Sequence, residues 1–247
     1  MEQAITQHAK VYITSAYEDA EPLQTAFNTT NLDKIRKHSI TNDPASADII
    51  FFIENSRFHK DYFYRQLKSH PLVKLYPSKV FMYNPHDHPW FVLPGLYANM
   101  PRKLFNNNFI AASPFFEVTN SYLYCDFSKT PEYLFSFNGN PQSCPSVRNK
   151  ILRLKHPRGK LENVYSSYFG KHPQPVKLGY ADLMAGSKFI LCPRGSGTSS
   201  IRLFEAMRAG RVPVIISDNW VPPIGPDRKS TRLNSSHCAL SRMPSSA

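Results

Sequence analysis

The residues whose types and spacing could do chemistry are concentrated between Cys192 and Gly210. The apolar run KFILC at 188–192 predicts a strand, and a helix is expected from Ser199 to Ala209, ended by Gly210. The glycines in the intervening loop, PRGSGT, let a backbone approach an anion closely. The first turn of the helix adds unpaired N–H groups and partial positive charge. The pattern predicts a diphosphate site built from Arg194, Gly195, Gly197, Ser199 and Ser200.

Arg202 and Glu205 lie three residues apart and therefore share one face of the expected helix. A carboxylate such as Glu205 suits a ribose, because it can accept hydrogen bonds from both hydroxyls. Arg202 could neutralise phosphate charge as a bond breaks, and Arg194 could add a bidentate phosphate contact. The same spacing fits an exposed ion pair worth well under about 1 kcal/mol, so spacing alone leaves both interpretations open.

The elements that must position these residues predict an α/β protein. Strands and helical stretches alternate in the first part of the chain, at 10–14, 21–38, 48–53, 58–69 and 79–83. This order implies a parallel sheet covered by helices. Residues 84–118 are rich in Pro and Asn and are expected to be irregular, and 122–127 is a candidate strand.

A second unit is expected beyond a boundary near 129–131. Its expected elements are strands and helices at 132–137, 145–154, 181–187, 188–192, 199–209 and 211–217. Ser143 and Ser146 are candidate caps for the basic helix at 145–154.

Composition limits the class of protein. A content of 41% hydrophobic and 19% charged residues over 247 positions fits an ordinary globular chain. The formal charge of +12 favours anionic partners, but Lys and Arg form no long run. The four Cys show neither a Cys-x-x-Cys pair nor zinc spacing with His, so no metal site is expected. The N-terminus lacks an apolar signal core, and no apolar run approaches ~18 residues, which favours a soluble, cytoplasmic protein.

The last stretch, RKSTRLNSSHCALSRMPSSA at 228–247, differs from the rest of the chain. It has no acidic residue and no strand or helix periodicity. A disordered basic tail would have this composition, but we favour a non-native segment such as translated adaptor sequence. Its four Lys or Arg residues account for four of the charges, which leaves +8 for residues 1–227.

Several adjacent motifs resemble the exostosin-type glycosyltransferases. They are Arg194-Gly195, SIRLFEA at 200–206, GRVPVIISDN at 210–219, LFSFNG at 134–139 followed by Val147-Arg148, and PGLY at 94–97, which is similar to bacterial members. The resemblance covers about 80–225 and is strongest over 188–220. It implies a GT-B-like fold of two Rossmann-like domains with parallel sheets. The N-terminal acceptor-side domain would span 1–130 and the C-terminal nucleotide-sugar-binding domain 131–227.

The same resemblance implies the reaction. A sugar would pass from a nucleotide-diphosphate-sugar, UDP- or GDP-linked, to a glycan or polysaccharide acceptor, with inversion and without a metal or other cofactor. Arg194, Arg202 and Ser199 or Ser200 would then meet the charge of the departing diphosphate. An inverting transfer also needs a general base.

Candidates for that base lie in the loop at 86–88, where Asp87 and His88 are preferred and His86 is the third choice. These residues also fit an ordinary polar loop or a weak metal site.

The chain departs from the family in two ways. Animal members carry an N-terminal membrane anchor, and none is seen here, which favours a bacterial-type soluble enzyme in the cytoplasm. Peripheral association with the inner face of the membrane is a further expectation. The family's donor domain continues past Trp220, whereas the suspect tail begins at Arg228. We therefore expect an incomplete C-terminal domain, which would leave this fragment inactive or unstable.

Two other classes of function stay open. Gly195-x-Gly197-x-x-Ser200 follows a strand, and Asp218 lies about 20 residues on, as in an NAD-binding Rossmann enzyme, although the third glycine is a serine. The basic charge also fits a nucleic-acid-binding module, whose affinity would fall steeply with salt. The scattered positions of Lys and Arg argue against nucleic acid as a partner.

Overall fold

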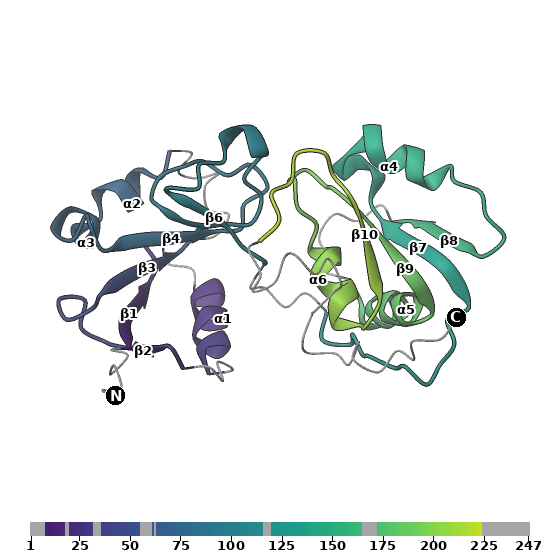
Figure 1. The fold of residues 1–247 in the computed structure, drawn as a ribbon, viewed down its shortest axis with the longest axis horizontal. Coiled ribbons are helices and arrows are strands. Elements are labelled where there is room, and N and C mark those ends of the chain that lie inside the picture. The colour runs from purple at the N-terminus through teal and green to yellow at the C-terminus, as the bar shows by residue number, and fades with distance from the viewer. Residues whose placement is uncertain are drawn as a thin grey trace, which may run out of the picture. The chain divides into compact units, whose positions relative to one another are not determined.

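The protein folds as two compact units, Met1–Glu117 and Val118–Ala247, and each is described here by itself (Figure 1). The structure is a computed structural model. It describes residues 8–17, 20–31, 36–54, 61, 63–115, 120–164 and 172–223. The stretch at 228–247 and most of the predicted helix before 65 lie outside these residues.

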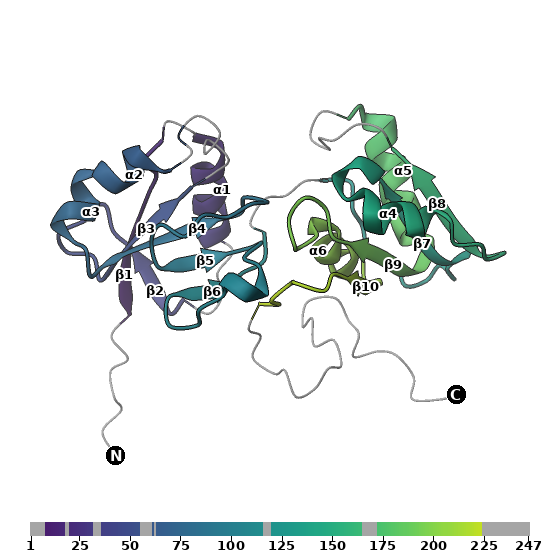
Figure 2. The same cartoon turned by 90° about the horizontal axis from the view of Figure 1, so that it is seen from above.

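The first unit contains a six-stranded sheet in the order β2-β1-β3-β4-β5-β6, and every neighbouring pair is parallel (Figure 2). The strands are β1 (Ala9–Thr14), β2 (His38–Ile40), β3 (Ile49–Ile53), β4 (Val80–Asn84), β5 (Gly95–Tyr97) and β6 (Ile110–Ala112). Helix α1 (Ala20–Thr30) lies on one face, and α2 (Arg65–Ser69) and α3 (Pro71–Leu75) lie on the other (Figure 1).

Strand β3 shows why this sheet is covered on both sides. Ile50 and Phe52 are fully buried in the same apolar cluster as Leu67 of α2. The alternate residue Ile53 is buried on the opposite face, with Ala26 of α1. An apolar run whose side chains alternate between two covered faces is the pattern expected of a central parallel strand.

The second unit repeats the architecture with a four-stranded parallel sheet, in the order β10-β9-β7-β8. Its strands are β7 (Tyr133–Gly139), β8 (Gly159–Asn163), β9 (Ser187–Pro193) and β10 (Val212–Ile216). Helix α4 (Pro145–Leu152) packs on one face. Helices α5 (Gln174–Ala185) and α6 (Ile201–Arg208) pack on the other (Figure 1). Two parallel, helix-covered α/β units confirm the predicted fold class.

The division between the units differs from the predicted boundary at 130/131. Leu123 belongs to the apolar core of the second unit. Asn120 donates from Nδ2 to the Lys177 carbonyl oxygen at 3.0 Å, and the Tyr124 hydroxyl donates to Asp182 Oδ1 at 3.0 Å. These contacts place residues 120–124 in the second unit.

Several local predictions also need correction. Residues 84–118, expected to be irregular, contain β5, β6 and a short 3-10 helix at Arg102–Leu104. No strand forms at 122–127, while β2 and β8 were not predicted. Helix α4 follows a 3-10 turn at Pro141–Ser143 and is capped by Cys144, which makes no side-chain capping bond, so neither predicted serine caps it.

Gly210 ends helix α6 as the sequence predicts. Its φ is 67°, and its N–H donates to the Met207 carbonyl oxygen. The N–H of Arg211 donates to the Ala206 carbonyl oxygen. This pair of bonds is a Schellman motif, which favours glycine at the left-handed position. A Cβ on Gly210 would lie 2.6 Å from Cys125 Sγ.

We expect Gly210→Ala to destabilise the chain by about 2 kcal/mol, because it adds this clash to the left-handed strain. Gly179→Ala is the matched control, since Gly179 lies inside α5 with open space at its Cβ position. That change should stabilise by about 0.5–1 kcal/mol through helix propensity. Urea titrations of both variants measure the two effects, and equal effects would show that Gly210 is not under constraint.

Candidate functional site

The predicted anion-binding residues lie at the topological switch point of the second sheet. Strand β7 sits between β8 and β9, and the chain leaves β7 toward α4 on one face and β9 toward α6 on the other. Diverging connections open a crevice at the carboxyl ends of such strands, and ligands of open α/β sheets bind there.

Arg148 joins the loops on the two sides of this switch point. Its Nε donates to the Arg194 carbonyl oxygen at 2.9 Å, and its Nη1 donates to that of Asn140 at 2.7 Å. The side chain is buried, and it fixes the loop after β9 to the segment after β7. A Cβ on Gly195 would lie 3.1 Å from Arg148 Nη2, so the glycine permits this close approach. Arg148 belongs to one of the motifs in the sequence, but no local pattern there predicts this role.

Arg202 projects from the first turn of α6 toward the end of β7. Its Nη2 donates to the Asn138 carbonyl oxygen at 2.6 Å, and its guanidinium carbon lies 4.8 Å from the centre of the Phe137 ring. The Arg148 guanidinium carbon lies 5.7 Å from the same ring. Two cations therefore flank one aromatic side chain at the switch point. The buried Nε of Arg202 has no hydrogen-bond partner among the residues that the structure describes.

Glu205 lies on the inner side of α6 and is buried. Its Oε2 accepts a 2.6 Å hydrogen bond from the hydroxyl of Tyr180 in α5. Burial, together with the charge of Glu205, raises the pKa of Tyr180 well above its usual value, so that the tyrosine stays protonated and donates. An exposed ion pair between Arg202 and Glu205 is therefore excluded. One carboxylate oxygen, Oε2, already accepts from Tyr180. This leaves Oε1 as the better acceptor for a ribose hydroxyl, whereas the sequence predicted that both hydroxyls would be bound.

The remaining predicted residues complete the loop. Arg194 is half-buried and donates from Nη2 to the Ser196 carbonyl oxygen at 3.3 Å. Gly197 and Ser199 are buried, and Ser200 is the N-cap of α6, without a side-chain capping bond. The structure therefore brings together every predicted residue of the second unit.

Asp87 and His88 belong to the first unit, in the loop after β4, and both are exposed. Two hydrogen bonds fix the first residues of this loop. The His86 N–H donates to Asn84 Oδ1 at 2.9 Å, and the His88 N–H donates to His86 Nδ1 at 3.0 Å. Within the described residues, no three His, Cys, Asp or Glu side chains gather as metal ligands. Of the helices in that same part of the chain, none is long and apolar enough to cross a membrane.

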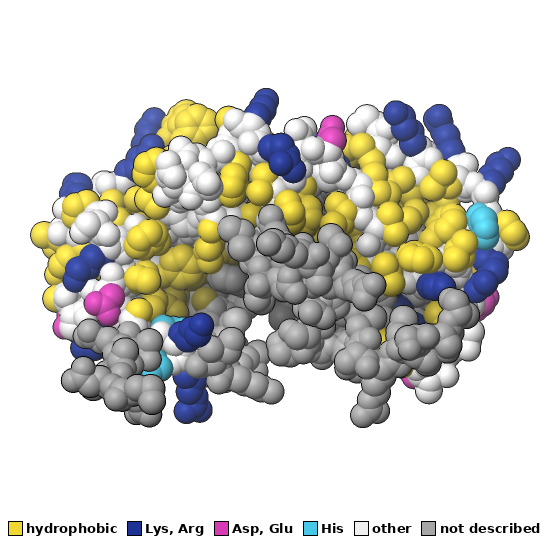
Figure 3. All heavy atoms as spheres, in the orientation of Figure 1, with side chains coloured by type: hydrophobic (Ala, Val, Ile, Leu, Met, Phe, Trp, Pro, Cys, Tyr) yellow, Lys and Arg dark blue, Asp and Glu magenta, His cyan; other side chains and the backbone are white. Residues whose placement is uncertain are grey.

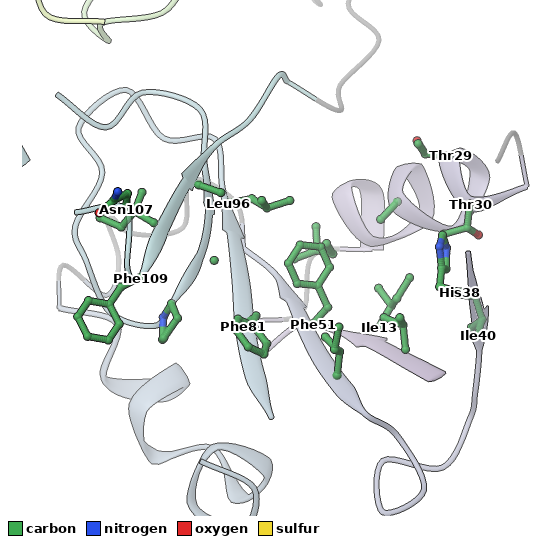
Figure 4. Close-up of a pocket in the computed structure, with 18 of the residues that line it drawn as sticks. Ile13, Thr29, Thr30, His38, Ile40, Phe51, Phe81, Leu96, Asn107 and Phe109 are labelled. Atoms are coloured by element: carbon green, nitrogen blue, oxygen red, sulfur yellow. The ribbon is translucent and has the colours of Figure 1, made fainter. Parts of the chain in front are cut away.

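A pocket of about 600 Å³ lies elsewhere, on the face of the first sheet beside α1 (Figure 4). Ile13, Phe51, Phe81 and Leu96 line it, with a few polar residues such as His38 at its edge. No sequence pattern pointed to it. Among its lining residues, all of which lie in the described part of the chain, His38 is the one ionisable side chain.

Taken together, these observations define a protein of two parallel α/β units, with two arginine side chains at the switch point of the second sheet. Residues 99–226 match the Exostosin GT47 domain. The chain therefore belongs to the exostosin GT47 family.

Individual relatives agree over shorter stretches. Over 44 residues the chain is 50% identical to "Exostosin-1 homolog" of Caenorhabditis elegans. This stretch covers 18% of this chain and 12% of that protein. Over 49 residues it is 45% identical to a "Probable glycosyltransferase" of Arabidopsis thaliana, covering 20% and 10%. The chain thus matches only about a tenth of the length of these relatives. A crystal structure of alpha1,3-fucosyltransferase overlaps 88% of this chain and 70% of its own, with a TM-score of 0.39 and 12% identity.

Proposed function

We propose that this protein acts in the transfer of a sugar from a nucleotide-diphosphate-sugar to a glycan or polysaccharide acceptor, with inversion and without a metal or separate cofactor. The observation that carries the proposal is the guanidinium of Arg202. It is held by Asn138 and Phe137 at the switch point, and its buried Nε has no partner among the described residues. A cation held in this way suits the charge that develops on a departing diphosphate.

Each predicted residue at the switch point has a role in this proposal. Arg194, the N-terminus of α6 and Ser199 or Ser200 bind the diphosphate. Arg202 stabilises the negative charge that develops on the β-phosphate oxygen as the bond from that oxygen to the anomeric carbon breaks. Glu205 accepts from a ribose hydroxyl, with Tyr180 holding the carboxylate in place. Asp87 and His88 stay the predicted proton acceptors for the attacking hydroxyl.

Calorimetric titration of the 247-residue chain with UDP, GDP and NAD, in excess chelator, tests the donor. We expect UDP or GDP to bind and NAD not to bind. Binding of NAD alone would support the Rossmann-enzyme alternative instead. Binding of UDP or GDP that disappears in chelator would contradict the metal-free mechanism.

Nucleic-acid binding is the remaining alternative. On the face drawn in Figure 3, Lys and Arg side chains are spread over the surface and not gathered in one patch. Polyelectrolyte binding depends on closely spaced cations, so this distribution does not favour it. A shift of DNA or RNA mobility at low salt would reopen that alternative.

A further inference from the structure

The buried polar side chains described in the first unit lie together at one edge of its sheet. They are Glu54, Asn84, Asn99 and Ser113. Each stands at the carboxyl end of one of four adjacent strands, β3 to β6, or within two residues beyond it. Glu54 Oε2 and Ser113 Oγ are buried there without a hydrogen-bond partner in the described residues. Buried polar atoms are normally paired, so this edge is built for polar contacts.

The same edge contains the switch point of the first sheet, between β1 and β3. The Tyr17 hydroxyl, after β1, donates to Asp61 Oδ2 at 2.9 Å, after β3. Tyr64 packs edge-on against Tyr17 at 6.1 Å, and its hydroxyl accepts from Asn84 Nδ2 at 3.2 Å. One network therefore ties the connections that leave β1, β3 and β4 to each other.

Two large aromatic side chains project from these connections to the surface. Phe63, next to Tyr64, is 48% exposed, and Trp90, in the loop after β4, is 49% exposed. Their rings lie 5.7 Å apart at 80°, an edge-to-face pair that fixes the orientation of the indole. The exposed Asp87 and His88 precede Trp90 in the same loop. A fixed aromatic face beside exposed hydrogen-bonding groups suits a ligand with one apolar face and a polar rim.

We propose that Trp90, braced by Phe63, is the surface on which one pyranose ring of the acceptor saccharide stacks. The inference rests on the proposed function, which requires a carbohydrate acceptor. The C–H face of a pyranose packs on the indole, while its equatorial hydroxyls reach the polar side chains of the loop at 86–88. The switch point, where ligands of such sheets bind, places this surface at the ligand-binding edge of the first unit.

A printed array of neutral and uronic-acid-containing oligosaccharides, probed with the 247-residue chain, tests the proposal. We expect wild type to retain at least one saccharide, and Trp90→Ala to bind it at least tenfold more weakly. Trp90→Phe should recover most of the binding, because it keeps an aromatic face. Leu75→Ala is the control, since Leu75 is 68% exposed but lies at the end of α3, which leads into the amino end of β4 at the opposite edge.

Donor titrations with UDP and GDP on the same variants separate this inference from the proposed function. Trp90→Ala should leave nucleotide affinity unchanged, because the donor residues are in the second unit. The inference alone is overturned if the chain binds a nucleotide but Trp90→Ala binds saccharides as well as wild type does. It is also overturned if the chain binds a nucleotide but retains no saccharide. If wild type binds neither UDP nor GDP, the proposed function is overturned. Self-association of the chain that Trp90→Ala abolishes would assign the surface to a second copy and overturn the inference.

Discussion

Replacing Arg202 by methionine is expected to weaken binding of UDP or GDP by about 10–100-fold, the usual cost of losing a hydrogen bond to a charged group. Sugar transfer should slow by about 10²–10³-fold, because the interaction strengthens as the diphosphate leaves. Methionine fills a similar volume over the Phe137 ring, so packing is largely kept. Calorimetric titration of the purified variant measures the first effect.

Two comparison variants make the Arg202 result specific. Arg202→Lys keeps the charge but loses the planar fork, and we expect an intermediate affinity. Arg208→Met removes an exposed arginine from the last turn of the same helix and should change the affinity by less than about twofold. Wild-type affinity in Arg202→Met would place the diphosphate away from Arg202, and equal losses in both methionine variants would indicate a general charge effect.

The central motif could be predicted because its signals are local. A continuous apolar run marks β9, two glycines mark the loop, and Gly210 marks the end of α6, so the observed β9-α6-β10 unit follows the predicted one closely. The same applies to β1, β3, β4 and β7, whose apolar patterns are strong.

The short strands could not be predicted, because their positions depend on distant neighbours. Strand β5 begins at Gly95, where φ is 151° and a Cβ would collide with the Met82 carbonyl oxygen. That constraint comes from β4 and leaves no local pattern. Similarly, helix α2 starts only at Arg65, because Tyr64 adopts a left-handed conformation while it bonds to Asn84.

The supporting contacts of the site were missed for the same reason. Arg148 is 46 residues from the loop that it holds, and Tyr180 is 25 residues from Glu205. Spacing rules identify residues that share a helix face, not side chains brought together by sheet topology. The aromatic pair of Phe63 and Trp90 is likewise a product of the fold.

Glu54 provides the second large effect, on stability. It is fully buried at the switch point of the first sheet, where Oε1 accepts from the Ala16 N–H at 3.0 Å. Burial raises its pKa to about 8, although the bonds from Ala16 and from the Ser15 side chain oppose the shift. Among the residues that the structure describes, Tyr17 and Tyr64 interact electrostatically with Glu54, and Asp61 belongs to the same network. None of these supplies a positive charge that would favour the ionised carboxylate.

The sign of the pH dependence follows from the raised pKa. The unfolded chain releases the Glu54 proton near the model-peptide value of about 4.3, whereas the folded chain keeps it to about pH 8. Between these values the native state binds more protons, so stability falls as the pH rises and levels off above 8. We expect Glu54 to contribute a loss on the order of a few kcal/mol between pH 5 and pH 8.

Glu54→Gln removes this titration and keeps an oxygen that can accept from the Ala16 N–H. The variant should therefore be more stable than wild type at pH 8 and similar to it at pH 4.5, as measured by urea titrations across that range. Glu132→Gln, at an exposed carboxylate in the second unit, is the matched control and should follow the wild-type curve. If Glu54→Gln also followed the wild-type curve, the pKa of Glu54 would be the same in the folded and unfolded chains. A group with equal pKa values in both states does not change the pH dependence of the unfolding free energy. The Glu54 carboxyl would then be solvated in the folded chain and not shielded from water by the carboxyl ends of β1 and β3.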